Sequence, residues 1–250
     1  MPRFDGRNSR LFLTLGLACG LVGSARAAFP LEYDAKVPAA TRAQLEGDLA
    51  RFFSMRGSKP TPLFRKTFGA FDGRSTSAWF FDRVGSVGVN LCTNEAAVAC
   101  VLSAWNGWIF LSPNYTKFSH PPIARLMVLF HEARHNETEE RNWPHAKCPT
   151  PFLDELGRPV RSIWTGEPLA GDLACDLEVG GSYGIATILL LNVAYRCDNC
   201  TAEERRDAEI YGLDQLRRIT WEPARTAIMK DAGVTKAYLV RRSRLRSVHR

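Results

Sequence analysis

The chain lacks the sequence signatures of several large functional classes. It contains neither a phosphate-binding glycine loop nor a Gly-x-Ser-x-Gly turn, so neither a P-loop nor a serine-hydrolase nucleophile elbow is predicted. Basic and aromatic residues do not interleave as they do on nucleic-acid-binding surfaces, and we expect no nucleic-acid partner. Internal repeats and low-complexity tracts are also missing, and no apolar run after residue 27 is long enough to cross a bilayer.

The N-terminus has the three parts of a secretory signal. Basic residues come first, followed by an uncharged, mostly apolar run over residues 11–23 and by an Ala-Arg-Ala pattern that ends at Ala27. This order predicts a signal peptide over residues 1–27, with an uncleaved N-terminal anchor as the alternative. We therefore expect an exported mature chain, periplasmic or extracellular, without a transmembrane span.

The remaining length is that of one domain with a substantial core, which we place at residues 28–235. The formal net charge of +7 is distributed unevenly. Residues 236–250 are rich in Lys and Arg and contain no Asp or Glu. We interpret them as a basic C-terminal tail, which either contacts anionic lipid or cell-wall polymer or is a solvated terminus.

Seven cysteines are present, and Cys19 lies within the predicted signal. An even number in an exported chain predicts disulfides. Sequence spacing favours the pairs Cys92–Cys100, Cys148–Cys175 and Cys197–Cys200. The last pair also has the spacing of a redox motif, but no βαβ pattern surrounds it, and a structural disulfide is the better interpretation.

Hydrophobic periodicity predicts helices, and runs of Val, Trp, Phe and Ile predict strands. The expected helices are 42–56, 122–137, 172–194, 201–218 and 222–232, and the expected strands, in a hairpin or meander, lie within 78–92 and 97–111. We interpret Trp79, Phe80 and Phe81 as core residues with strand spacing. The sequence thus predicts an α+β domain, disulfide-braced, in which a small sheet packs on the buried helices 122–137 and 172–194.

The segment His131-Glu132-Ala133-Arg134-His135 is the strongest chemical signal in the chain. On a helix, His131 and His135 project from one face and suit two nitrogen ligands of one zinc ion. Glu132 is one step round the helix, where its carboxylate can reach a zinc-bound water and act as a general base. The alternative is an exposed helix end with ordinary polar residues.

This segment resembles the HExxH helix of the zincin zinc metallopeptidases. The resemblance implies one zinc ion, a mixed sheet beside the helix and an edge strand along the substrate, for which residues 105–111 are the candidate. The chain departs from the family at Arg134, where zincins usually have an uncharged residue, and it lacks the metzincin extension. A wider arrangement joins this segment to His-x-x-Cys at 145–148, Cys-Asp at 175–176 and Gly-Gly-Ser-Tyr-Gly at 180–184. It is similar to a pattern in uncharacterised bacterial exported proteins, and that resemblance implies no activity.

The third ligand is open between two residues. His145 lies three residues before Cys148, and Asp176 adjoins Cys175, so a Cys148–Cys175 bridge would bring both toward the metal. We favour His145, with Asp176 as the alternative and Glu178 as a further option; the residue that does not bind could orient a ligand. Tyr183, seven residues after Asp176, is a candidate for stabilising an oxyanion, or else a core tyrosine.

Two functions fit these observations. The first is an exported zinc hydrolase, most simply a metallopeptidase that acts on peptide or cell-envelope amide bonds. The second is a non-catalytic exported domain that has a structural metal and binds envelope polymers or another protein. Coordination distinguishes them, because a catalytic site keeps one position open for water whereas four protein ligands close a structural site.

Overall fold

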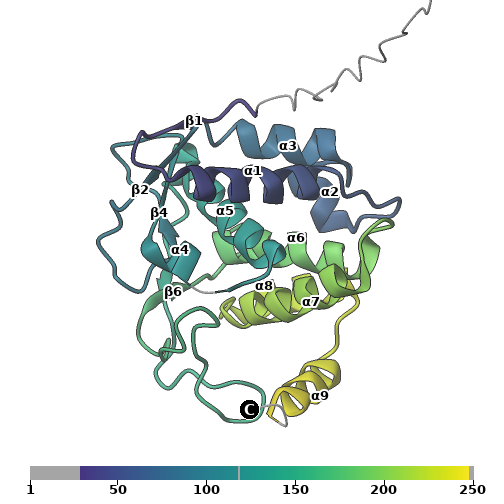
Figure 1. The fold of residues 1–250 in the computed structure, drawn as a ribbon. Helices are drawn as coiled ribbons and strands as arrows, with labels where there is room; N and C mark the ends of the chain where they lie inside the picture. Colours follow the sequence, from purple (N-terminus) through teal and green to yellow (C-terminus); the bar gives the residue numbers. More distant parts are fainter. Residues whose placement is uncertain (1–28, 118, 248–250) are drawn as a thin grey trace, which may run out of the picture.

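The computed structural model describes residues 29–117 and 119–247, and this part of the chain folds into a helical body with a small mixed sheet at one side (Figure 1). The α-helices of the described chain are α1 (Ala39–Phe53), α2 (Pro62–Phe68), α3 (Gly73–Phe81), α4 (Pro113–Lys117), α5 (Pro122–His135), α6 (Ser182–Arg196), α7 (Ala202–Arg217), α8 (Glu222–Ala232) and α9 (Lys236–Ser247). The predicted α+β class is therefore confirmed. The predicted signal peptide lies outside the described residues.

The main sheet has the strand order β1-β2-β4-β3. Its strands are β1 (Glu32–Tyr33), β2 (Ser86–Val89), β3 (Ala99–Cys100) and β4 (Trp108–Leu111). β1, β2 and β4 run parallel, and β3 pairs with β4 in the antiparallel direction. A second, two-stranded sheet joins β5 (Ala146–Lys147) to β6 (Leu173–Cys175).

Two parts of the strand prediction are wrong. Residues 73–81 form helix α3, which the Asp72 side chain caps by accepting a hydrogen bond from the Ser75 N–H. Trp79 and Phe80 are core residues as expected, but they reach the core from this helix, and Trp79 stacks on Phe130 of α5. β2 and β4 are parallel, so they do not form the expected hairpin.

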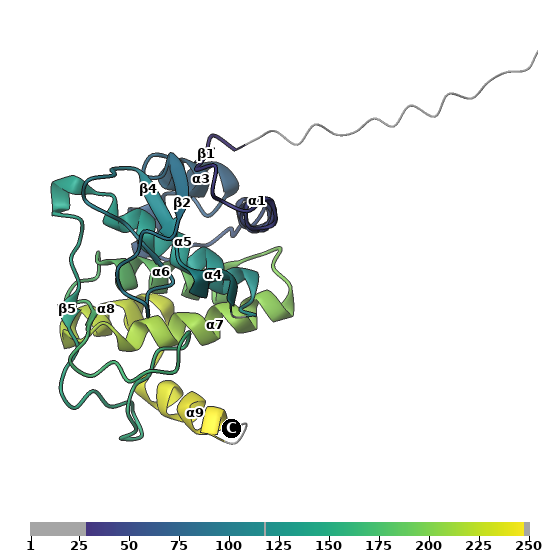
Figure 2. The same cartoon turned by 60° about the vertical axis from the view of Figure 1, so that its left-hand side comes forward.

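Helices α5 and α6 form the centre of the core. α5 packs against α6, α1 and the sheet, and α6 lies between α5 and α7 (Figure 2). The apolar residues of α5 are buried on nearly all sides from Ile123 to Ala133, as the sequence predicts. Burial continues through His131 and Glu132, which sets polar groups at the inner end of an apolar helix.

The second buried helix begins ten residues later than predicted, at Ser182. Residues 173–175 are instead the strand β6, and Asp176 then bridges to the end of α7: its N–H donates to the carbonyl of Arg218, and its carbonyl accepts from the N–H of Thr220. Asp176 therefore precedes the helix that contains Tyr183, so these two residues do not share one helix, as the predicted helix 172–194 implied.

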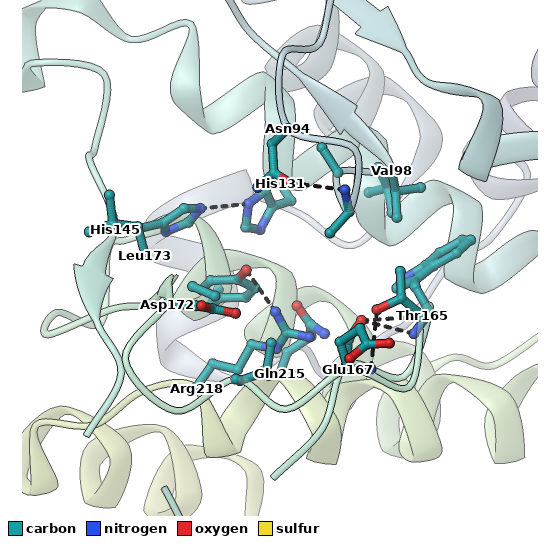
Figure 3. A pocket seen from close by; sticks show the side chains of 18 of the residues that line it. Asn94, Val98, His131, His145, Thr165, Glu167, Asp172, Leu173, Gln215 and Arg218 are labelled. Atoms are coloured by element: carbon teal, nitrogen blue, oxygen red, sulfur yellow. Dashed lines mark hydrogen bonds between the residues drawn. The ribbon is translucent and has the colours of Figure 1, made fainter. Parts of the chain in front are cut away.

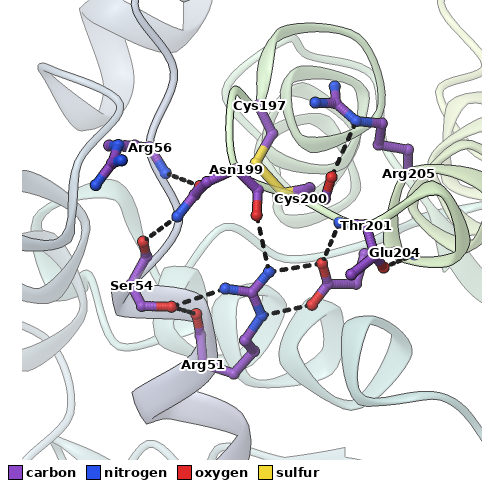
Figure 4. Close-up of polar contacts among 9 residues, drawn as sticks. All are labelled: Arg51, Ser54, Arg56, Cys197, Asn199, Cys200, Thr201, Glu204 and Arg205. Carbon is purple, nitrogen blue, oxygen red and sulfur yellow. Dashed lines mark hydrogen bonds and ion pairs between the residues drawn. A yellow bond between two sulfur atoms is a disulfide. The ribbon is translucent and has the colours of Figure 1, made fainter.

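All three predicted disulfides are present. The Cys197–Cys200 loop is part of a polar clamp between α1 and α7 (Figure 4). Asn199 contacts the end of α1 through both its side chain and its carbonyl, and Arg51 of α1 forms a two-nitrogen ion pair with Glu204 of α7. Because these groups are engaged in holding two helices together, the loop has a structural role.

The basic segment begins as helix α9, on the side of α7 away from the sheet in both views (Figures 1 and 2). Arg242 forms an ion pair with Glu209 of α7, and Lys236 forms one with Glu222 of α8. Ser243 is fully buried, where it accepts a hydrogen bond from Arg217. None of the helices between residues 29 and 247 is long and apolar enough to span a membrane.

Candidate metal centre

Three histidine side chains converge at the inner end of α5. The Nε2 atoms of His131 and His135 are 3.3 Å apart, and each lies 3.1 Å from Nε2 of His145. Among the described residues, these three side chains form a group whose ligand atoms could hold a metal ion. The structure thus brings together the two helix histidines predicted as ligands and the favoured third residue.

The spacing of the three nitrogens matches a metal centre. With metal–nitrogen bonds of about 2.0–2.1 Å and tetrahedral angles, two ligand nitrogens are about 3.3–3.4 Å apart. The observed separations of 3.1–3.3 Å are close to this value. Three imidazoles could not approach so closely if all were protonated, because their charges would repel. The cluster could therefore hold a metal ion.

Burial keeps two of these imidazoles neutral. It lowers the pKa of His131 well below the usual range, and it lowers the pKa of His135 to about 4, with the neighbouring histidines acting in the same direction. Neutral imidazole is the form that binds a metal. In the metal-free protein these two ligands therefore need no deprotonation near pH 7.

His145 is carried back to α5 by a tight loop. Arg141, Asn142 and Trp143 all have positive φ angles, between 47° and 62°, which cost free energy for residues with a Cβ atom. Asn142 compensates through two hydrogen bonds to His135: its carbonyl lies 2.7 Å from Nδ1, and its amide donates to the His135 carbonyl at 2.7 Å. The loop therefore orients His135 as well as returning His145.

Arg134 fixes the other side of this loop. Its guanidinium lies over the Trp143 ring at 4.1 Å, donates to the Gly180 carbonyl at 2.7 Å and pairs with Glu137. The Trp143 indole N–H donates to Glu137 as well. The residue that departs from the zincin pattern thus braces the segment that carries the third histidine.

Asp176 is positioned behind His145 and does not point at the metal centre. Its Oδ1 lies 2.9 Å from His145 Nδ1, which is on the opposite side of the ring from the converging Nε2. Its Oδ2 accepts the backbone N–H of Tyr183 at 2.7 Å, at the start of α6. Asp176 therefore orients the candidate ligand His145. The sequence analysis left this role open for the residue, His145 or Asp176, that does not bind the metal. Glu178 is not in the cluster.

Gly181 permits this arrangement. A Cβ atom at that position would lie 2.3 Å from Asp176 Oδ2, well inside the contact distance of any side chain. Glycine is therefore required where the Asp176 carboxylate turns toward both His145 and the α6 N-terminus.

Glu132 is buried beside the histidines, with 7 % of its surface exposed. No hydrogen-bond donor of the described chain pairs with its carboxylate, and burial raises its pKa to about 8. Placing an unpaired carboxyl group in such a site costs free energy unless it is protonated or a cation lies nearby. Its position favours proton exchange with a group in the adjoining cavity.

A cavity of about 790 Å³ opens beside the cluster, and His131, Glu132 and His145 are all in its wall. On one side it is bordered by residues 96–99, which lead into the edge strand β3. The predicted substrate-binding edge, residues 105–111, is wrong because β4 lies inside the sheet, between β2 and β3. The metal centre is thus accessible from a space large enough for a few residues of peptide.

The opposite wall of the cavity contains residues that the sequence did not single out. Gln215 and Arg218 extend from the end of α7 toward the space beside His131 and His145 (Figure 3). Arg218 donates to the Tyr183 hydroxyl at 2.8 Å, and the Tyr183 ring packs against the rings of both His131 and His145. Burial raises the pKa of Tyr183, so its hydroxyl stays protonated. No local pattern marks Arg218, which directly follows α7 and is far along the chain from the histidines.

Comparisons of the chain with protein-family models, with curated proteins and with solved structures find no match. The geometry and chemistry of the site are therefore the basis for assigning a function.

Proposed function

We propose that this protein is an exported zinc-dependent hydrolase, most simply a metallopeptidase resembling the zincins. The observation that carries the proposal is the convergence of His131, His135 and His145 in the wall of a cavity that also contains Glu132. Three neutral imidazoles suit zinc, which prefers nitrogen and sulfur ligands in a tetrahedral site.

The number of ligands favours a catalytic centre over a structural one. Asp176, the remaining candidate, has both carboxylate oxygens engaged, by His145 and by Tyr183. Three protein ligands would leave a fourth position open, as in catalytic zinc sites, and His131 and His145 both line the cavity. The alternative of a closed structural site would need a fourth side-chain ligand, and the described chain provides a cluster of three.

Zinc bound here would supply Lewis acidity and lower the pKa of a coordinated water to about 7. Glu132 is the residue we assign as general base. Its carboxylate lies in the same cavity wall as two of the ligands, so it can accept a proton from the attacking water and pass it to the leaving amine. The pKa raised by burial favours holding that proton between the two steps.

Tyr183 is the residue we assign to stabilising the negative charge that develops on the carbonyl oxygen. Arg218 donates to the phenol oxygen, which makes the hydroxyl a better donor toward the cavity. The chain before β3 could align an extended peptide by strand addition, since β3 is an edge of the sheet. The disulfides agree with an oxidising, extracytoplasmic environment for such an enzyme.

The test combines metal content with hydrolysis. Mature protein, Glu132→Gln and His131→Ala would be loaded with zinc, analysed by mass spectrometry and incubated with a mixed peptide library. We expect zinc in the first two proteins, little in the third, and cleavage by the unmodified protein alone. Zinc binding that is unchanged in His131→Ala would contradict the assigned ligands, and equal cleavage by Glu132→Gln would contradict the assigned base.

A further inference from the structure

Arg218 is a buried cation in the wall of the metal cavity. The residue is 6 % exposed, and it borders the same space as His131 and Glu132. Nη1 donates to the Tyr183 hydroxyl at 2.8 Å, whereas Nε has no hydrogen-bond partner in the described chain. Buried guanidinium N–H groups are normally paired.

The nearest acid does not complete the set. A carboxylate oxygen of Asp214 lies 3.9 Å from Nε, which is too long for a hydrogen bond. That same oxygen accepts from the Gln215 side chain at 3.2 Å. Asp214 thus offsets part of the charge without a hydrogen bond, and the hydrogen-bonding capacity of the guanidinium is only partly used within the described chain.

We infer that Arg218 binds a carboxylate of the substrate next to the scissile bond, so that the preferred substrates are peptides with a negative charge at that point. This inference rests on the proposed hydrolase function. A guanidinium presents N–H groups in a planar fork that matches a carboxylate, and the pairing strengthens where water is excluded. The carboxylate belongs either to the C-terminus of the peptide or to an Asp or Glu side chain.

Three acidic residues line the cavity, and one of them, Glu132, is the group we assign as general base. The other two, Glu167 and Asp172, are exposed, so solvent and salt screen their charges (Figure 3). Arg218 lies inside, where screening is weaker. An anion in the cavity would therefore meet a cation whose charge Asp214 offsets only in part, close to the histidine cluster.

The test uses thiols that ligate the metal through sulfur and differ in one group. The protein would be loaded with cobalt, whose visible absorption reports thiolate binding. The probes are 3-mercaptopropionyl-glycine, with a terminal carboxylate, 3-mercaptopropionyl-glutamate α-amide, with a side-chain carboxylate, and 3-mercaptopropionyl-glutamine α-amide, which is neutral. Arg218→Gln removes the cation, and Arg217→Gln is the matched control, because Arg217 is a neighbouring buried arginine that pairs with Glu155 away from the cavity.

We expect one carboxylate probe to bind about 10–100-fold more tightly than the neutral probe, as a charged hydrogen-bonded pair provides. The tighter probe identifies the source of the carboxylate. The preference should disappear in Arg218→Gln and persist in Arg217→Gln, with cobalt content unchanged in both. Equal binding of all three thiols to the unmodified protein would overturn the role of Arg218 but would leave the proposed hydrolase function standing. Failure of every thiol to perturb the cobalt spectrum would count against an open metal position and hence against the proposed function.

Discussion

Replacing Asp176 with Asn tests whether this buried carboxylate holds the third ligand in place. The carboxylate accepts two hydrogen bonds, from His145 Nδ1 at 2.9 Å and from the Tyr183 N–H at 2.7 Å. An asparagine has the same shape but only one acceptor oxygen, so its amide group must face one of these two donors. One charge-assisted bond is lost and a donor–donor contact replaces it.

The expected loss follows from these two contacts. Removing a residue that orients a zinc ligand weakens metal affinity by about 10–100-fold. The lost charged hydrogen bond also lowers the free energy of unfolding by about 1.5–3 kcal/mol. Zinc affinity would be measured by competition with a chromophoric chelator, and stability by denaturant unfolding of the zinc-free protein.

Asp172→Asn is the matched control, because Asp172 is an exposed acid beside the same strand and has no hydrogen bond or ion pair with a histidine of the described chain. We expect its zinc affinity to stay within about twofold of the unmodified protein, as for surface charges that are screened by salt. If Asp176→Asn binds zinc as tightly as the control does, then Asp176 does not orient His145 and the description of the centre is wrong.

Three further predictions concern the same site. The zinc-free protein should lose stability as the pH falls from about 6.5 to about 4. Burial lowers the pKa of His135 to about 4, so the unfolded chain binds more protons than the folded chain in this range. Unfolding of chelator-treated protein at several pH values would show this loss, and a flat profile would refute the burial effect. Glu132→Gln should retain zinc while hydrolysis falls by about 10²–10⁴-fold, measured as kcat/KM; a change in KM alone would exclude a role as general base. Arg134→Gln should weaken zinc binding more than Arg65→Gln does. Arg134 contacts the loop before His145 and holds it in place, whereas Arg65 is an exposed residue of α2. Equal zinc affinities of the two variants in chelator competition would show that the loop does not need Arg134.

The helix part of the site was predictable because its pattern is local. His131 and His135 are four residues apart in a segment whose apolar periodicity predicts a helix, and both features are present. His145 and Asp176 were recognised as a pair through the Cys148–Cys175 bridge, but which of the two faces the metal depends on the positive φ angles after Glu140. Sequence spacing contains no information on that turn.

The parts that were missed depend on contacts between distant segments. The run Trp79-Phe80-Phe81 has strand-forming residues, yet the Asp72 cap and packing on Phe130 favour a helix. Arg218 reaches the cavity because the Asp176 backbone pairs with the end of α7, and that pairing joins positions more than forty residues apart. Such pairings follow from tertiary packing and leave no periodic signal.

X-ray absorption at the zinc edge tests the central claim most directly. On zinc-loaded mature protein, we predict three imidazole nitrogens and one non-protein oxygen at about 2.0–2.1 Å, without sulfur. The number of imidazoles should fall in His145→Ala, whereas Asp176→Asn should keep all three on the zinc that remains bound. A spectrum with four protein ligands, or a protein that retains no zinc after loading, would contradict an open three-histidine centre.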